Sequence, residues 1–237
     1  MSTDTADTAD TAAGTDGGPT EVKLSRLRRA IAKSMSASAL VPQFTVEYDV
    51  PFDGVAAYRS RWKAAGHDIS VADVLTAACA RALRTHRQVN ASWAETSILQ
   101  HAEVNVGLAV ALPDGLVAPA VRSADTLDLG QLAAERKRLT LAAQEGRLTP
   151  EELLSATFTI SNLGTFGVSR FRALVVPPQA AILAVGGVRP DGTVALALSC
   201  DHRVLDGAPA ALFLRDVAGS LLEPAWLDQL VPERSSS

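Results

Sequence analysis

The sequence predicts an α/β protein that folds as one domain. Stretches typical of strands and of amphipathic helices alternate along residues 21–230, as expected where helices pack against a sheet. Residues 179–188 and 193–202 are continuous apolar runs, which favours strands of a central sheet that is covered on both faces. Because no second linker-like stretch divides this part of the chain, about 215 residues are expected to form one unit.

The charge and composition exclude some classes of partner. The chain has a formal net charge of −4, but the first twenty residues contain four aspartates and no lysine or arginine, so the remainder is close to neutral. A nearly neutral body with 5% aromatic residues lacks the basic, base-stacking surface that nucleic-acid binding needs. Nucleic acid is therefore not expected as a partner.

The two ends are expected to be disordered. Residues 1–20 repeat Thr-Ala-Asp and contain no Leu, Ile, Val or aromatic residue, so they cannot bury enough apolar surface to offset their chain entropy. An alternative interpretation of 1–20 is the stub of a linker to a further domain. The predicted organisation is an acidic tail over 1–20, a catalytic domain over 21–230 and a C-terminal tail over 231–237.

Cysteine usage and hydropathy favour a cytoplasmic protein. Cys79 and Cys200 are the two cysteines, which is too few for a disulfide framework and lacks the paired spacing of a zinc site. The cysteine spacing therefore predicts no metal site. The N-terminus shows neither a signal-peptide nor a transit-peptide pattern. No apolar stretch approaches the roughly 20 residues that span a bilayer, so no membrane is expected.

The N-terminal half is predicted to contain two helices and a strand. Apolar residues recur at helical spacing over 24–35, and Pro42 ends this helix. Residues 43–50 alternate apolar and polar side chains, which predicts a half-buried strand. A second helix is predicted over 70–86, where Ser70 stands as the N-cap before an apolar face.

The middle of the chain is predicted to form a strand pair followed by two helices. Residues 104–121 indicate a strand, a Pro-Asp-Gly turn and a second strand. An amphipathic helix follows over 129–148. A short helix lies within 148–156, where Thr149 and Glu152 stand at the positions of a capping box.

The C-terminal half supplies three strands and the last helix. In the strand over 157–164, Phe158 and Ile160 point to one face, while Ser161 points to the other. The apolar runs described above give the next two strands. The last helix is predicted over 206–223, with Asp206 at its start, where a carboxylate suits the helix dipole.

One histidine stands where an α/β sheet can carry chemistry. In SCDHRVLDGAPAA, residues 199–211, His202 follows a buried strand and begins the pattern His-x-x-x-Asp-Gly. Strand ends in α/β sheets face crevices where reactive groups can meet a ligand, and histidine is the side chain best suited to proton transfer near neutral pH. By itself the pattern is equally compatible with a structural histidine.

Several segments resemble one enzyme family in their order along the chain. LSRLRRAIAKSM, VPQFTVEYDV, VNASW, VNVGLAVALPDGLVAPAV, ATFTISNLGTFGV and SCDHRVLDGAPAA resemble the catalytic domain of the acyltransferase component of 2-oxoacid dehydrogenase complexes. Chloramphenicol acetyltransferase is similar to this family in fold and mechanism. Condensation domains of peptide synthetases share the histidine motif, but Asp201 stands here in place of their second histidine, which weakens that alternative.

The resemblance implies a fold, an assembly and two catalytic roles. The implied fold is a two-layer chloramphenicol acetyltransferase-like α/β fold, with a central mixed sheet flanked by helices, that assembles as a homotrimer with active sites between subunits. His202 would be the general base that deprotonates a hydroxyl or thiol acceptor. Ser161 would donate a hydrogen bond to the tetrahedral oxyanion from across the boundary to the neighbouring subunit. Acetyl-CoA would be a co-substrate, and no cofactor would be bound permanently.

Further residues are assigned to support this site. The resemblance places Asp206 beside the catalytic pair as a structural anchor that pairs with Arg28, and it gives Gly207 and Asn162 supporting roles. The alternative for Ser161 is an ordinary turn serine before Asn162. Cys200 has the strand parity of a core residue, and the other three histidines are expected at the surface.

Two enzymatic readings and one non-enzymatic reading follow. The preferred one is a free-standing acetyltransferase that acetylates a hydroxyl of a tetronate-type natural-product intermediate, because no lipoyl domain precedes the catalytic segment in this sequence. The alternative is the dihydrolipoamide S-acyltransferase core of a 2-oxoacid dehydrogenase complex. A catalytically inactive scaffold with the same fold is the third reading, against which the presence of His202, Ser161 and Asp206 argues.

Overall fold

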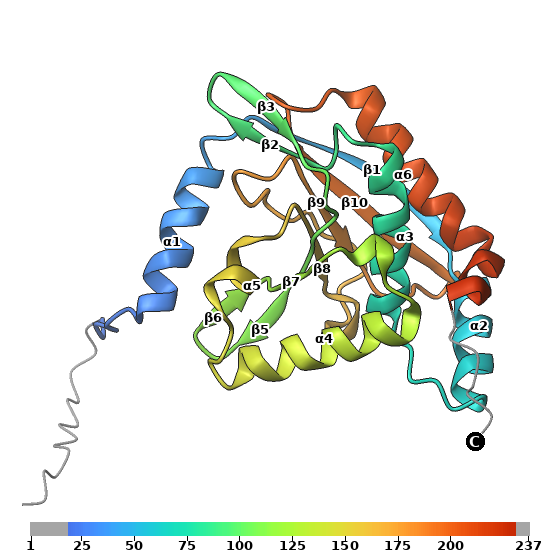
Figure 1. Ribbon diagram of the computed structural model, residues 1–237. Helices are drawn as coiled ribbons and strands as arrows, with labels where there is room; N and C mark the ends of the chain where they lie inside the picture. Colours follow the sequence, from blue (N-terminus) through green and yellow to red (C-terminus); the bar gives the residue numbers. More distant parts are fainter. Residues whose placement is uncertain (1–18, 231–237) are drawn as a thin grey trace, which may run out of the picture.

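The computed structural model describes residues 19–230, and a six-stranded sheet lies at its centre (Figure 1). The strands are, in spatial order, β1 (Gln43–Pro51), β10 (Thr193–Asp201), β9 (Ala181–Val185), β8 (Phe158–Asn162), β4 (Val106–Leu108) and β7 (Ala120–Val121). Strand β8 runs parallel to β9 and β4, whereas the other neighbours are antiparallel. The sheet is therefore mixed, as predicted. Tails are predicted at 1–20 and 231–237, of which residues 1–18 and 231–237 lie outside the described residues.

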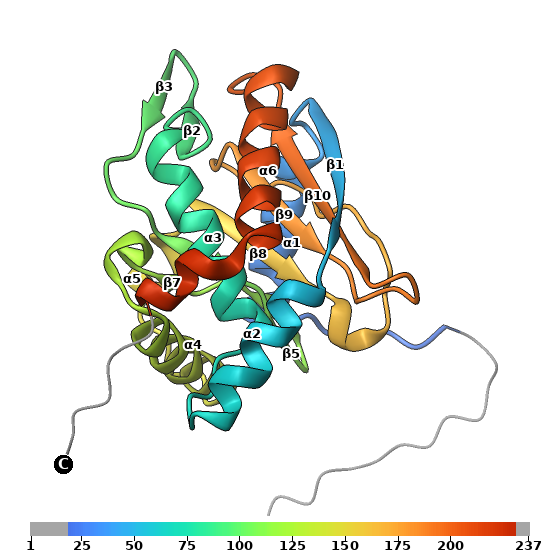
Figure 2. The ribbon, with the colours of Figure 1, turned by 90° about the vertical axis from the view of Figure 1, so that its right-hand side faces the viewer.

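Helices cover one face of this sheet. The helices of the described residues are α1 (Arg26–Ser38), α2 (Asp53–Ala64), α3 (Val71–Thr85), α4 (Leu129–Gln144), α5 (Pro150–Leu154) and α6 (Gly207–Leu222), with short 3-10 turns η1 (Ala124–Thr126), η2 (Gly164–Phe166) and η3 (Pro224–Leu230). Of these, α1 stands apart from the helical layer and contacts β6. Figure 2 looks onto the layer formed by α3 and α6 in front of the strands. The predicted two-layer α/β architecture is confirmed.

The core lies between the sheet and this helical layer. Alternate residues of the central strands, such as Phe158 and Leu198, pack with buried residues of α3 and α6 such as Leu75 and Phe213. The rings of Phe158 and Phe213 meet edge to face, with their centroids 5.5 Å apart. Each fully buried side chain of this size contributes about 1.5–3 kcal/mol, so the alternation along β8 fixes which of its faces turns to the helices.

The opposite face of the sheet is covered by a loop rather than by helices. This loop joins β8 to β9, and its Arg170 forms ion pairs with Glu47 and Asp49 of β1. Its backbone passes so close to Gly186 that a Cβ there would overlap the carbonyl oxygen of Ser169. Ser161 points toward this loop-covered face, away from the helices.

Helices α1 and α3 differ sharply in how much of their surface the chain buries. Ten of the fifteen residues of α3 are buried, and its first turn is fixed by a Ser70–Asp73 capping box and an ion pair from Arg136 to the buried Asp73 at 2.7 Å. In α1, Ser38 is the buried residue. Its apolar side chains Leu27 and Ile31 remain partly exposed.

The structure departs from the predictions in three places. Residues 104–121 do not form one strand pair, because β4 and β7 join the main sheet while β5 (Val110–Leu112) and β6 (Gly115–Val117) form a separate hairpin. A second hairpin, β2 (Ala91–Ala94) with β3 (Ser97–Gln100), and helix α2 were not predicted. Pro119 has no N–H to give to a ladder, which is one reason that the predicted continuous strand is divided.

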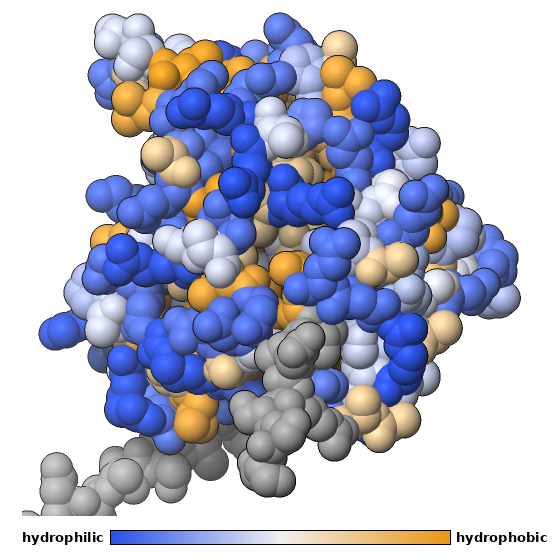
Figure 3. Space-filling view, turned by 45° about the vertical axis from the view of Figure 1, so that its right-hand side comes forward, coloured by the Kyte–Doolittle hydropathy of each residue, from blue (hydrophilic) through white to orange (hydrophobic). Residues whose placement is uncertain are grey.

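The outer surface on the helical side is mainly hydrophilic. Figure 3 shows this side with hydrophobic residues in small separate groups. No helix within residues 19–230 is long and apolar enough to cross a membrane.

Candidate active site

His202 stands directly after β10, at a corner where three elements meet. Its backbone N–H donates to the carbonyl oxygen of Pro42 at 2.8 Å, which fixes the end of β10 against the start of β1. Its ring packs at a tilt of 54° on Phe44, with the centroids 4.6 Å apart. The side chain is 51% exposed, so one edge of the imidazole is open to a ligand.

Packing positions the imidazole of His202, and its nitrogen atoms make no hydrogen bond within the described residues. Within residues 19–230, the carboxylate that approaches the ring is that of Asp206, whose Oδ1 lies 3.7 Å from Nδ1 of His202. This distance is longer than a hydrogen bond. A ring that is packed on one face and has free nitrogen atoms can accept a proton from a bound substrate.

Asp206 occupies the N-cap position of α6 but makes no side-chain hydrogen bond to the first turn of the helix. Its side chain is 86% exposed. The carboxylate therefore lies near both the helix N-terminus and the His202 ring, where a negative charge is favourable.

The expected pairing of Asp206 with Arg28 is not formed within residues 19–230 of one chain. The guanidinium of Arg28 lies beside Gly115, in the turn between β5 and β6. The reason is the length of α1: its C-terminal end at Ser38 is close to the His202 corner, but Arg28 lies ten residues earlier, about 15 Å along the helix. The Asp206–Arg28 anchor therefore stays a prediction, and the described residues of one chain do not form it by themselves.

Ser161 is placed on another part of the same sheet. It is 8% exposed and is paired in register with Ala184 of β9, which is in turn paired with Ala197 of β10. Ala197 precedes His202 by five residues, or roughly 16 Å at the usual rise of a strand. One chain therefore does not bring Ser161 to its own His202.

Asn162 and Gly207, the two residues with predicted supporting roles, differ in their local contacts. The Oδ1 atom of Asn162 accepts a hydrogen bond from the backbone N–H of Gly164 at 2.9 Å, so Asn162 shapes the turn that follows Ser161. Gly207 begins α6, and a Cβ added there would meet no atom within 4 Å. Within one chain, the position of Gly207 does not require a glycine for steric reasons.

Both cysteines are unsuited to act as nucleophiles. Cys79 and Cys200 are fully buried, and burial raises the pKa of the Cys200 thiol to about 12. The thiolate is the reactive form of cysteine, so neither residue competes with His202 for a role in catalysis. The prediction that Cys200 is a core residue is confirmed.

The other histidines are less exposed than predicted. His86 Nε2 lies 2.8 Å from Oδ2 of Asp216, and its side chain is 14% exposed. His101 Nε2 lies 2.8 Å from the hydroxyl of Ser92, and burial lowers the pKa of His101. The surface prediction is wrong here, because the elements that cover these rings, α6 and the β2–β3 hairpin, come from other parts of the chain.

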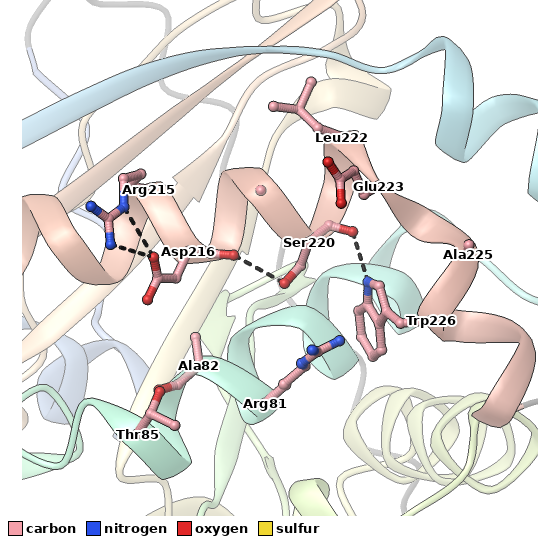
Figure 4. A pocket seen from close by; sticks show the side chains of 11 residues that line it. Arg81, Ala82, Thr85, Arg215, Asp216, Ser220, Leu222, Glu223, Ala225 and Trp226 are labelled. Carbon is pink, nitrogen blue, oxygen red and sulfur yellow. Dashed lines mark hydrogen bonds and ion pairs between the residues drawn. The ribbon is translucent and has the colours of Figure 1, made fainter.

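A well-formed hollow lies elsewhere in the molecule. It measures about 690 Å³ and lies between α3, α6 and η3 (Figure 4). The guanidinium of Arg81 stacks over Trp226 there, and the Trp226 indole N–H donates to the carbonyl oxygen of Ser220 at 2.8 Å. Neither His202 nor Ser161 lines this hollow. No group of three or more His, Cys, Asp or Glu side chains within residues 19–230 is placed to hold a metal.

Phe44 and the pair Asp201–Arg203 are site features that the sequence did not reveal. Alternation along β1 indicated that Phe44 points inward, but its contact with His202 depends on the pairing of β1 with β10. The sequence likewise gave no sign that Arg203 folds back onto Asp201.

Comparisons with known proteins support an acyltransferase domain. The family model of 2-oxoacid dehydrogenases acyltransferase (catalytic domain) matches residues 16–227. The dihydrolipoyllysine-residue acetyltransferase component of the pyruvate dehydrogenase complex of Zymomonas mobilis is 38% identical over 209 residues, which cover 81% of this chain and 48% of that protein. The chain thus spans about half the length of this relative.

Similar solved structures also belong to acyltransferases of this family. The dihydrolipoamide acetyltransferase of Azotobacter vinelandii has a TM-score of 0.83 and 33% identity, with 89% of this chain and 94% of that chain covered. The cubic core of the pyruvate dehydrogenase multienzyme complex gives the same values. Chloramphenicol acetyltransferase matches with a TM-score of 0.53 and 15% identity, covering 80% of this chain and 94% of that one, so the likeness to it concerns the fold alone.

These findings correct the preferred functional reading. The relatives at 35–38% identity are acetyltransferase components of pyruvate dehydrogenase complexes, and they favour the alternative reading over a tetronate-tailoring acetyltransferase. The preference for a free-standing hydroxyl acetyltransferase rests on the absence of a lipoyl domain ahead of residue 21, and that absence says nothing about the acceptor. The chain belongs to the acyltransferase catalytic-domain family of the 2-oxoacid dehydrogenases.

Proposed function

We propose that this chain transfers an acetyl group between a dihydrolipoyl thiol and coenzyme A, with His202 as the general base. The observation that carries the proposal is the half-exposed imidazole at the end of β10, packed on Phe44 and without a hydrogen-bonded partner in the described residues. Membership of the acyltransferase family and the names of the relatives support the two substrates.

The proposed reaction is one direct transfer. His202 takes the proton from the thiol of coenzyme A, and the thiolate sulfur attacks the carbonyl carbon of the S-acetyldihydrolipoyl group. The tetrahedral intermediate then expels the dihydrolipoyl thiolate, which recovers the proton from the imidazolium. Both substrates are aligned before the chemistry, so no acyl-enzyme is formed, and no permanently bound cofactor is needed.

Ser161 is proposed to stabilise the oxyanion of that intermediate. A hydroxyl aimed at the developing charge lowers the barrier by about 3–4 kcal/mol. Because Ser161 of one chain is far from His202 of the same chain, the serine is proposed to come from a neighbouring subunit. The partly exposed apolar side chains of α1 support such an assembly, since Ser38 is the one residue that this helix buries within its own chain.

The assembly is proposed to be a homotrimer with its active sites between subunits. The number of subunits rests on the resemblance to the family. Asp206 is proposed to orient the His202 ring through Nδ1 rather than to accept its proton. In the Azotobacter vinelandii relative, the histidine and the asparagine that were studied for their catalytic roles are also four positions apart.

An acyl-transfer assay tests the proposal. The protein is given acetyl-CoA and dihydrolipoamide, and the release of free coenzyme A and the formation of S-acetyldihydrolipoamide are followed together. Equal amounts of both products are expected, and both should depend on His202. Absence of turnover above that of the His202→Ala variant would contradict the proposal and favour a scaffold. Succinyl-CoA and a branched acyl-CoA in parallel reactions test the acetyl preference.

A further inference from the structure

Two charged residues flank His202 and form an ion pair that the proposed reaction does not use. Asp201 is the last residue of β10 and is 1% exposed. Its carboxylate accepts hydrogen bonds from the backbone N–H of Arg203 at 2.9 Å, from Nε at 2.9 Å and from Nη2 at 2.7 Å. A buried carboxylate is thus satisfied by a residue two positions away.

This pair has a geometric consequence for the residue between its members. His202, Arg203 and Val204 form the turn that follows β10. Arg203 closes back onto Asp201 across this turn, while the ring of the intervening His202 lies on Phe44. The Asp201 carbonyl oxygen also accepts from the N–H groups of Val204 and Leu205, at 3.0 and 2.9 Å, which closes the turn after the histidine.

The pair is itself held from behind by another part of the chain. The guanidinium of Arg203 lies over the ring of Trp93, 4.8 Å from its centroid. Trp93 belongs to β2, and its backbone N–H donates to the carbonyl oxygen of Pro178 at 2.9 Å. The hairpin β2–β3 therefore forms the rear support of the His202 corner.

Stability alone is a weak reason for this arrangement. Burial of a charge is costly, and replacing a buried ion pair with well-packed apolar residues is often neutral or stabilising. A planar guanidinium, in contrast, fixes a carboxylate through two parallel hydrogen bonds with defined directions. The ion pair is thus better explained by the geometry that it imposes, since it fixes the orientation of the backbone at His202.

We propose that Asp201, Arg203 and Trp93 form a positioning clamp that fixes the direction in which the His202 imidazole points. The clamp rests on the proposed function, because the ring that it positions is the proposed general base. None of the three residues is required to touch the substrate. Their effect reaches the reaction through the orientation of His202.

Arg203→Lys and Trp93→Leu test the clamp. Arg203→Lys keeps the positive charge but loses the two-pronged contact, and Trp93→Leu keeps the ion pair but removes its support. A misplacement of the base by a fraction of an ångström to about 1 Å costs roughly ten- to a hundredfold in rate, so kcat should fall by about tenfold or more for Arg203→Lys and less for Trp93→Leu. The KM for coenzyme A should stay within about twofold of its wild-type value, because the clamp acts on the base and not on uniform substrate binding.

The matched control is Arg147→Lys. Arg147 also pairs with a carboxylate two positions away, Glu145, but both side chains are exposed at the end of α4. This variant should leave kcat unchanged. Thermal unfolding of all variants identifies those that fold. If Arg203→Lys does not fold, the Trp93→Leu variant still tests the clamp.

A measurement on the ring separates the clamp from the reaction. Histidine labelled with ¹³C gives one Cε1–Hε1 cross-peak per ring, and the peak of His202 is assigned with His202→Ala. In the clamp variants this peak should broaden or split, while those of His67 and His86 stay in place. An unchanged His202 peak in a folded variant overturns the clamp, whatever the activity, and so does a changed peak with wild-type kcat. If the wild-type protein does not turn over dihydrolipoamide, the proposed function fails, and the peak alone decides the clamp.

Discussion

The corner around His202 and the strand that carries Ser161 belong to one sheet, but the two side chains differ in their surroundings and in how much of each is exposed. The corner is held by its own chain through Pro42, Phe44 and the turn after β10, and it leaves the imidazole half exposed. Ser161 is nearly buried beneath the loop-covered face of the sheet, far from that imidazole. Under the proposed function, each chain therefore supplies two half-sites, one with His202 and one with Ser161, and a neighbouring subunit completes each of them.

The largest effect is expected from the half-site that performs proton transfer. His202→Ala should lower kcat by about a hundredfold or more, consistent with the loss of a general base. The assay is acetyl transfer from acetyl-CoA to dihydrolipoamide at saturating substrates. His67→Ala is the matched control, and it should retain wild-type kcat. A loss under about tenfold in His202→Ala would show that the two half-sites have been assigned the wrong roles.

The other half-site should contribute to the transition state and not to substrate binding. Ser161→Ala is expected to lower kcat by about a hundredfold or somewhat more, as for the removal of one oxyanion donor. The affinity for coenzyme A, measured by calorimetry, should be unchanged. Equal damage to affinity and kcat would instead mark Ser161 as a structural turn residue.

A smaller effect is expected at the residue beside the base. Asp206→Asn keeps the size of the side chain and its ability to accept a hydrogen bond, and the charge it removes is largely exposed to solvent. We expect kcat to fall by about two- to fivefold. The Asp206→Ala variant should lose more, because it also removes the polar partner of the ring. Loss on the scale of His202→Ala would give Asp206 a direct part in proton transfer.

The smallest effect concerns the pH dependence of the hairpin that supports the His202 corner. Burial lowers the pKa of His101, so the folded protein binds this proton less tightly than the unfolded chain, whose histidines titrate near pH ~6.5. The stabilisation from neutral His101 is complete above that pH and is lost as the pH falls through it toward the lower pKa of the folded state.

The wild-type Tm should therefore fall more than that of His101→Gln between about pH 7.5 and about pH 5.5. Differential scanning fluorimetry of the two proteins in matched buffers measures this difference. Parallel Tm curves would mean that His101 does not couple protonation to folding.

The same contrast explains what the sequence could predict. The sequence predicts a helix over 70–86 because the N-cap Ser70 and the apolar face are local signals, and helix α3 is found at Val71–Thr85. The alternation around Ser161 in β8 and the place of His202 after β10 are local too. These features need only the residues next to them in the chain.

Features that depend on distant pairing could not be predicted. Helix α2 begins at Asp53 after the N-cap Phe52, whose side chain makes no capping hydrogen bond, and the helix buries only Val55 and Trp62. The turn of the β2–β3 hairpin places Glu95 at a positive φ of 54°, where glycine or asparagine would be the usual signal. The separation of Ser161 from His202 depends on the sheet order, which no local pattern encodes.

The claim that the active site is shared between subunits is tested most directly by mixing its two defects. His202→Ala and Ser161→Ala chains, each nearly inactive, are co-expressed with different tags, and oligomers that carry both tags are isolated. If one site combines His202 of one subunit with Ser161 of the next, each mixed trimer holds one intact site out of three, so the isolated oligomers should show about a third of wild-type activity. Mixed oligomers no more active than either variant alone would contradict the account.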